Sequence, residues 1–281
     1  MHQTPQARRP LVPLLAGLAA LLLFSCALPP LTLGEVTGAP SSRISQEELV
    51  HRHILNIVKK MPSGGGYSIG ADASSRLTES AILWDENRQK LLVSPSRATP
   101  SFCSGACYLV LLQLLQRCPE GSFSPAVWQA LDAVPGQKDG QGVWGRANAN
   151  GPGFAKLIHD LRAGVSFEDP SLARPGDFLK LFWTSEIGGR ERGHLVVYLG
   201  SGTTPEGKPG LKFWSSNQGV GYSVKTVPLD KASRLLFTRI TSMRAFQNIP
   251  RLSDNDEWLE SLLRQPTTIQ EVRKKCGLPP R

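Results

Sequence analysis

No apolar run in this chain of 281 residues reaches the roughly 20 residues that span a bilayer comfortably. The longest extends from Leu11 to Leu23 and is interrupted by Pro13. The sequence also lacks a dense run of lysine and arginine interleaved with aromatic residues, so nucleic acid is not an expected partner. Its net charge of +9 indicates instead a generally basic surface, which attracts anionic polymers.

The apolar run nevertheless has the context of a secretory signal. Two arginines precede it, and small residues around Cys26 follow it. We therefore expect residues 1–27 to be a signal peptide and the protein to be exported to the periplasm or cell envelope. The run also ends in a sequence similar to a lipobox, in which Cys26 carries lipid after cleavage. Ordinary cleavage near Ala27 is the alternative, and lipid on Cys26 is the only membrane contact we expect.

Cysteine is scarce, with five in the chain, and no second cysteine or histidine cluster lies near Cys103 and Cys107. These two residues are spaced like two zinc ligands on one helix, but a structural zinc site needs four ligands. Neither a metal nor an organic cofactor is therefore expected. In an exported protein the other cysteines can pair, and a disulfide between Cys118 and Cys276 stays open.

The chain is expected to form one domain over residues 45–245. An exposed linker rich in Pro, Gly, Ser and Thr precedes it over 28–44, and a C-terminal extension with a short amphipathic helix follows over 246–281. Apolar spacing predicts helices over 45–60, 103–115, 124–133 and 154–163, with the Gly- and Asn-rich stretch 134–153 as loop. Alternation predicts strands over 177–183, 194–199, 211–215, 222–227 and 235–241. Helices first and strands afterwards indicate an α+β fold.

The expected position of Cys103 is typical of a catalytic nucleophile. It lies where the helix over residues 103–115 is expected to begin, and the free N–H groups and dipole of a helix N-terminus stabilise a thiolate. Small residues follow it, which leaves room for a substrate to approach. Cys107 lies one turn further on among apolar residues, and we expect it to be a small core residue instead.

A thiol nucleophile needs an imidazole to take its proton and a third group to orient that imidazole. His194 fits because it follows Gly193 and opens an apolar strand, whose end can face a helix N-terminus. The other candidates are His51 and His53 on the first helix, and His159 on a later one. We expect all three of these to be solvated.

Three local signatures, in this order, resemble the NlpC-type papain-like cysteine peptidases of bacterial cell walls. They are Cys103-Ser104-Gly105 at a helix start, Arg174-Pro175-Gly176-Asp177-Phe178 before a strand, and Gly193-His194-Leu195-Val196-Val197-Tyr198-Leu199-Gly200. The resemblance covers about residues 95–230. It implies a papain-like α+β fold, with the cysteine-bearing helix packed on an antiparallel sheet. It also implies hydrolysis of peptide bonds in peptidoglycan stems through a thioester on Cys103, with His194 as the base.

The chain departs from that family at the third polar residue, which the family often supplies as a histidine on the next strand. Here that strand reads Phe213-Trp214-Ser215-Ser216-Asn217-Gln218. We predict Asn217, because its amide carbonyl can accept the imidazole N–H, and Ser215 on the same face of the strand is the alternative. Phe102 also replaces the family's Asp before the cysteine. The backbone N–H of Cys103 is the expected oxyanion donor, and its companion donor stays open.

The stretch 134–153 supplies the candidate substrate-binding side chains, which are Trp144, Arg146 and Asn148, with Asn150 beside them. The sequence thus predicts an exported cysteine hydrolase that acts on a cell-wall peptide or another amide, with anionic wall polymer as a second partner. Two alternatives remain. One is an amidase or acyltransferase that uses Cys103 and His194 on another substrate, and the other is an inactive wall-binding module of the same fold.

Overall fold

The computed structural model describes residues 28, 30–31 and 45–279. The expected signal peptide, Cys26 within it, and most of the expected linker lie outside these residues. No helix in the described part is long and apolar enough to cross a membrane. Leu31 departs from the exposure expected of the linker, because its side chain is fully buried in the core and its N–H donates to the carbonyl of Arg117.

A seven-stranded sheet contains most of the strands, in the order β1-β9-β8-β7-β5-β10-β4, and all neighbours in it are antiparallel. These strands are β1 (Gly64–Gly65), β4 (Gly164–Phe167), β5 (Phe178–Phe182), β7 (His194–Thr203), β8 (Pro209–Asn217), β9 (Gly221–Pro228) and β10 (Arg234–Ile240). Two short antiparallel pairs lie outside the sheet: β2 (Ile82–Asp85) with β3 (Lys90–Val93), and β6 (Ile187–Gly188) with β11 (Pro266–Thr267).

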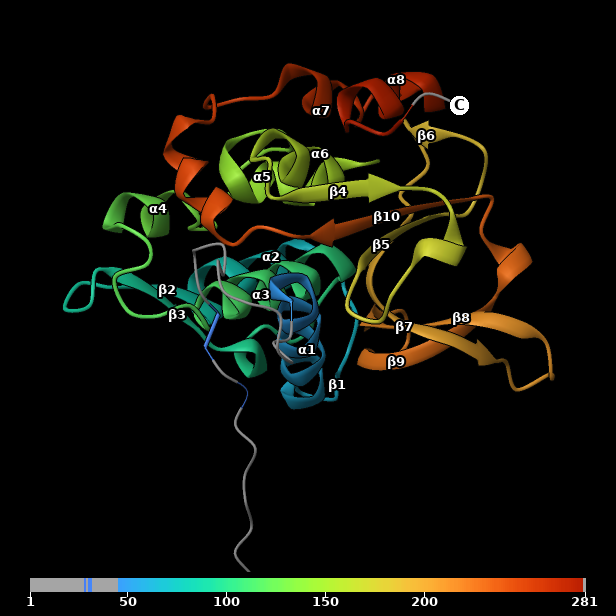
Figure 1. Ribbon diagram of the computed structural model, residues 1–281, viewed down its shortest axis with the longest axis horizontal. Coiled ribbons are helices and arrows are strands. Elements are labelled where there is room, and N and C mark those ends of the chain that lie inside the picture. The colour runs from blue at the N-terminus through green and yellow to red at the C-terminus, as the bar shows by residue number, and fades with distance from the viewer. Residues whose placement is uncertain (1–27, 29, 32–44, 280–281) are drawn as a thin grey trace, which may run out of the picture.

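Helices dominate the first half of the chain, which confirms the predicted α+β class. They are α1 (Gln46–Lys60), α2 (Ala71–Ser75), α3 (Cys103–Leu115), α4 (Pro125–Ala130), α5 (Gly142–Asn148) and α6 (Gly153–Asp160), followed near the C-terminus by α7 (Glu257–Ser261) and α8 (Ile269–Lys275). Figure 1 shows α1 to α6 on the left and in the middle of the view, and strands β7, β8 and β9 on the right.

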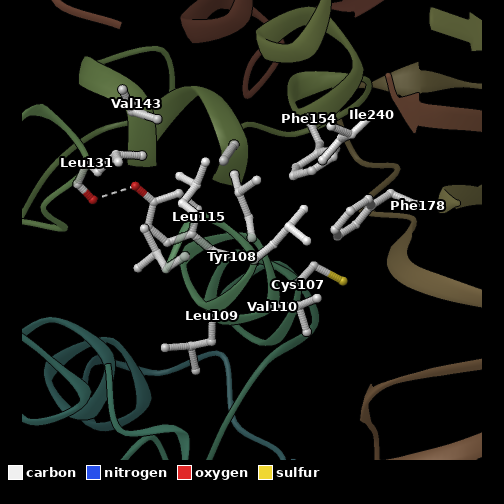
Figure 2. Packing of buried hydrophobic residues seen from close by; sticks show 14 of the residues in the cluster. Cys107, Tyr108, Leu109, Val110, Leu115, Leu131, Val143, Phe154, Phe178 and Ile240 are labelled. Atoms are coloured by element: carbon white, nitrogen blue, oxygen red, sulfur yellow. Dashed lines mark hydrogen bonds between the residues drawn. The ribbon is translucent and has the colours of Figure 1, made fainter. Parts of the chain in front are cut away.

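Helix α3 is the centre of the core. It contacts α1 and α5 as well as β7 and β8, and all but its first two residues and Gln113 are buried. A helix that is apolar all round must be covered on every side. Figure 2 shows Cys107 on the same side of the view as Phe178, while the Tyr108 hydroxyl reaches the other way and donates to the carbonyl of Leu131. The prediction that Cys107 is a core residue is confirmed.

Helix α1 begins where the sequence predicts. The hydroxyl of Ser45 accepts a hydrogen bond from the N–H of Glu48, which satisfies one of the free donors of the first turn. Its two histidines differ from the prediction. His51 and His53 are buried, so the expectation that they are solvated is wrong.

The reason for the burial of His51 is Asp177, which is remote in sequence. Nε2 of His51 lies 2.9 Å from Oδ1 of Asp177, directly before β5. Arg239 of β10 donates to both carboxylate oxygens of Asp177, at 2.9 and 2.8 Å. Gly176 has a φ of +102°, and a Cβ there would come within 2.9 Å of the His51 ring. This charge network therefore joins α1 to the sheet. The close approach of α1 also requires glycine at position 176, since any other residue there would be strained.

The stretch 134–153 contains a helix, α5, where the sequence predicts only loop. Trp144 on α5 packs against Phe102 and Tyr108, with ring centroids 6.1 and 5.0 Å apart. This aromatic packing compensates for the poor helix propensity of the glycines in the segment. Gly145 is itself required, because a Cβ there would lie 2.1 Å from the carbonyl oxygen of Lys138.

The C-terminal extension packs closely on the rest of the chain. The predicted boundary at residue 245 falls inside a 3₁₀ helix, Arg244–Arg251. Beyond it, β11 pairs with β6, and Leu259 and Leu262 pack against Ala149. Figure 1 shows α7 and α8 together at the top of the molecule, above α5 and α6. The extension thus continues the same body and reaches the region of the candidate site.

Candidate active site

Cys103 is the first residue of α3, as predicted. Phe102 before it is extended and makes no side-chain cap. The first N–H groups of a helix have no partner inside the helix, and here the cap residue does not take them either. They and the helix dipole therefore favour negative charge on the Cys103 sulfur, which is half-buried.

The sheet brings His194 and Asn217 together. His194 is the first residue of β7 and Asn217 the last of β8, and the antiparallel register of the two strands places these ends opposite each other. Nε2 of His194 lies 3.1 Å from Oδ1 of Asn217. The other ring nitrogen, Nδ1, is left for the thiol of Cys103, whose pKa the imidazole lowers.

Hydrogen bonds on its amide nitrogen determine which atom Asn217 presents to the imidazole. Nδ2 donates to the carbonyl oxygens of Ser215 and Ser223 and to the hydroxyl of Ser223, at 3.2, 2.9 and 3.0 Å. Because an amide nitrogen only donates, these partners place the carbonyl oxygen toward His194. An acceptor at this position makes Nε2 the protonated nitrogen, so the unprotonated Nδ1 can accept the thiol proton.

Two aromatic side chains pack against the imidazole of His194 and fix the orientation of its ring. Trp183 stacks on it with a centroid separation of 6.2 Å, and Phe213 meets it edge-on at 5.7 Å. These contacts hold the ring of His194 with Nε2 toward Asn217 and leave Nδ1 free of this bond.

Of the four described cysteines, Cys103 alone has an acidic thiol. Burial on its own raises the thiol pKa, but the hydrogen bond and the charge of His194 outweigh it, with help from the Lys180 ammonium and the backbone N–H of Leu195. The pKa of Cys103 therefore falls from 9.0 to about 6. Burial instead raises the pKa of Cys118 and of Cys276 to about 12.

The alternative third residue, Ser215, does not reach the imidazole. Its hydroxyl donates to the carbonyl of Leu195 at 2.8 Å, and its side chain is fully buried beside Cys107. Strand alternation puts Ser215 and Asn217 on the same face, as expected, but Asn217 is the one opposite His194. The structure therefore leaves the orienting position to Asn217.

A cavity of about 670 Å³ opens at Cys103. Ligand pockets usually measure roughly 300–1,000 Å³, so a short peptide segment fits. Its walls come from residues 67–78, from the start of α3, from the stretch 134–155 and from strands β5 and β7. Leu263 of the C-terminal extension also lines it.

Two of the three predicted substrate-binding residues line this cavity, and one does not. Trp144 and Asn148 are in its wall, where Asn148 accepts from the Ser104 hydroxyl at 2.7 Å. The prediction that Arg146 lines the cleft is wrong. Its side chain is buried, with Nη1 3.0 Å from Asp256 and Nη2 donating to Ser253. Arg146 points away from the cavity because the C-terminal extension supplies these partners.

Three cavity residues escape the sequence analysis. Burial, followed by the negative charge of Cys103, raises the pKa of Tyr67 to about 12, so its hydroxyl stays protonated beside the sulfur. Burial raises the pKa of Asp139, whose oxygens accept from Nδ2 of Asn148 and from the N–H of Asn150. Lys180 of β5 is the third. Its signal in the sequence is a lysine inside an apolar strand, and that of Tyr67 is its position after three glycines.

All four described cysteines are free, so Cys118 and Cys276 do not form a bridge in this structure. Across residues 28, 30–31 and 45–279, no group of three or more His, Cys, Asp or Glu side chains is placed to hold a metal ion. Comparison with family models, curated proteins and solved structures finds no match to this chain.

Proposed function

We propose that the protein is a cysteine hydrolase that cleaves an amide bond through a thioester on Cys103. The observation that carries the proposal is a cysteine, Cys103, at a helix N-terminus on a cavity wall, with a thiol pKa of about 6 that His194 lowers, while Asn217 holds the imidazole. At neutral pH such a thiol is mostly ionised and shares its proton with the imidazole. This is the state in which a cysteine attacks a carbonyl carbon.

The geometry supports the following sequence of steps. The Cys103 thiolate forms a bond to the carbonyl carbon, and the carbonyl electrons move to oxygen. As that oxyanion collapses, the C–N bond breaks and protonated His194 gives its Nδ1 proton to the leaving amine. A water molecule then attacks the thioester while His194 accepts its proton, and the second collapse releases the carboxylic acid and the thiolate. Asn217 does not react and keeps the imidazole in the tautomer that these transfers need.

Two donors are available for the oxyanion. The backbone N–H of Cys103 is the one expected from sequence, because the first residue of a helix has no partner for it inside the helix. The hydroxyl of Tyr67 is the second, since it lines the same cavity and remains protonated beside the sulfur. Donors aimed at the developing negative charge lower the barrier of both steps.

The proposed substrate is a peptidoglycan stem peptide, and the proposed family is that of the NlpC-type papain-like peptidases. The support is the sequence resemblance and the arrangement of the segments that carry it. Residues 103–105 open α3, which contacts β7. The segments 174–178 and 193–200 lead into β5 and β7, which are neighbouring strands. We propose that the protein acts after export to the cell envelope, for which residues 1–27 supply the signal.

The test of this proposal is digestion of purified stem peptides, read as newly released amino groups and by the masses of the products. The wild type is expected to cleave at one bond and Cys103→Ala to leave the peptide intact. Cys118→Ala is the matched control, because its thiol is half-buried and lies outside the cavity, and it should cleave at the wild-type rate. Cleavage that survives Cys103→Ala contradicts the proposed chemistry. Complete inactivity of the wild type on peptides and simple amides favours the wall-binding module.

A further inference from the structure

Strand β5 contains a lysine where its pattern calls for a core residue. Phe178 and Phe182 face the helices and are each 1% exposed, and alternation puts Lys180 on the same face between them. Strand neighbours Leu179 and Leu181 are fully buried on the other face. A charged side chain on a buried face is uncommon and carries information, because an apolar residue there would stabilise the fold more.

The side chain of Lys180 reaches the cavity, and the chain beside it leaves space for its ammonium. Lys180 lines the same cavity as Cys103, and its Nζ donates to the carbonyl of Arg192 at 2.9 Å. Gly193, directly before the catalytic histidine, has a φ of +54°. A Cβ on Gly193 would lie 2.6 Å from Cε and 3.1 Å from Nζ of Lys180. Glycine is required before His194 by this positive φ and by the carbonyl oxygen of Leu181, 2.6 Å from such a Cβ, and the end of the Lys180 side chain occupies the space beside it.

In the part of the chain that the structure describes, the ammonium of Lys180 has no carboxylate in a salt bridge with it, and the largest negative charge that acts on it is that of the Cys103 thiolate. The nearest acidic groups are engaged elsewhere: Asp139 accepts from Asn148 and Asn150, and Glu191 accepts from the N–H and hydroxyl of Thr184. Burial lowers the pKa of Lys180, and the negative charges of Cys103, Glu191 and Asp139 offset this only in part.

Arg192 adds a second positive charge to the cavity wall. It is exposed, and its guanidinium donates to the carbonyl of Gly189 at 3.0 Å. Apart from Cys103, the charged side chains among the described residues that line the cavity are therefore these two cations and Asp139. Two N–H donors of the Lys180 ammonium remain after its bond to the Arg192 carbonyl, and both are available to a ligand.

We propose that Lys180 is the binding site for a carboxylate of the substrate, so that the enzyme selects amides with a free carboxylate close to the scissile bond. This inference rests on the proposed function, since it concerns the cavity in which Cys103 reacts. A carboxylate bound to Lys180 adds a negative charge in direct contact with the ammonium and forms a charge-assisted hydrogen bond. It also fixes the position of the carbonyl relative to the sulfur, which is a source of rate as well as of specificity.

Two alkylating reagents of nearly the same shape test this inference without a known substrate. Iodoacetate and iodoacetamide both react with a thiolate, which forms an S–C bond as iodide leaves with the bonding electrons. The first reagent has a carboxylate where the second has an amide. The quantity to measure is the ratio of their rate constants at Cys103. The thiolate fraction cancels in this ratio, so a change in thiol acidity does not affect it. Glutathione provides the ratio for a thiol without a binding site.

We expect the ratio of iodoacetate to iodoacetamide to exceed that of glutathione in the wild type and to fall at least about tenfold in Lys180→Met, a factor equivalent to about 1.4 kcal/mol. Lys180→Arg should keep a preference for iodoacetate. The matched control is Lys212→Met, which removes the same charge from an exposed position on β8 and should leave the ratio unchanged. In the wild type, acetate at constant ionic strength should protect Cys103 from iodoacetate, and this result requires no variant.

The outcomes separate this inference from the proposed function. Equal slowing of both reagents in Lys180→Met, with no protection by acetate, would show that Lys180 serves only the thiolate, and the carboxylate site would be refuted. The dyad would still stand in that case if alkylation by iodoacetamide depends on His194. A Cys103 that resists iodoacetamide altogether overturns the proposed function itself, and the carboxylate site with it.

Discussion

Replacing His194 with alanine is expected to lower the turnover of a cleaved stem peptide by about 10²–10⁴-fold. In the proposed mechanism His194 takes the proton of Cys103 and returns it to the leaving amine, and among the described histidines it is the one that lowers the pKa of the Cys103 thiol. The loss should appear in kcat, because the imidazole contributes to the transition state more than to substrate binding. The measurement is steady-state turnover, with circular dichroism to establish that the variant is folded.

His159→Ala is the matched control for this prediction. His159 is an exposed residue at the end of α6, as the sequence analysis expects, and lies outside the cavity lining. Its replacement should leave turnover unchanged. The turnover of Asn217→Ala should lie between those of His194→Ala and His159→Ala, with a loss of about tenfold or more because the imidazole loses its acceptor. Ser215→Ala should retain wild-type turnover. Turnover that is the same in His194→Ala and His159→Ala would rule out His194 as the base.

Replacing Asp177 with alanine is expected to lower the free energy of unfolding by about 3–5 kcal/mol, the usual cost of removing one partner from a buried ion pair. Asp177 is fully buried, and its loss strands Arg239 and His51 without their shared carboxylate. For a domain of this size the change corresponds to a fall in Tm of roughly 6–20 °C. Urea unfolding and a thermal melt followed by circular dichroism measure it.

The effect of Asp177 should also depend on pH. Burial alone raises its pKa, but hydrogen bonds from Arg239, His51 and the N–H of Arg174 hold it below the ordinary value of 3.8. A carboxyl with a depressed folded pKa contributes stability that is complete above its unfolded pKa, about 3.9, and is lost as the pH falls through the folded pKa. The gap between wild type and Asp177→Ala should therefore be constant at neutral pH and narrow below about pH 4.

An exposed ion pair on α1 supplies the control for Asp177. Glu48 and Arg52 are 3.0 Å apart, and their side chains are 46% and 47% exposed. Glu48→Ala should change the free energy of unfolding by less than about 1 kcal/mol, because solvent screens such pairs. Comparable effects of Glu48→Ala and Asp177→Ala would contradict a structural role for the buried network.

The positions of Cys103, His194 and Asn217 are predictable because each stands at the end of a regular element that local patterns mark. Alternation predicts β7 and β8, and antiparallel pairing of consecutive strands then places the start of one opposite the end of the next. The choice between Asn217 and Ser215 depends on the register of β7 against β8, which the sequence alone does not give. A shift of the strand pairing by two residues would have reversed it.

The residues that the sequence analysis misplaced or missed depend on partners far away in the chain. His51 is buried because Asp177 lies 126 positions further on, and Arg146 because Asp256 lies 110 positions further on. Lys180 is predictable as a misfit in an apolar strand, but only the arrangement of β5, β7 and α3 shows that its ammonium meets the Cys103 cavity. Local patterns thus predict elements and their ends, whereas buried polar partners are set by the tertiary fold.

The pH dependence of iodoacetamide alkylation at Cys103, followed by peptide mass spectrometry in the wild type and in His194→Ala, tests the dyad most directly. In the wild type we predict a midpoint at about pH 6 for Cys103, while Cys118 in the same sample reacts only at much higher pH. In His194→Ala the midpoint of Cys103 should move toward about 8.5, the value of an ordinary thiol. A wild-type midpoint near 8.5, or one that does not move when His194 is removed, would contradict a Cys103 thiolate sustained by His194.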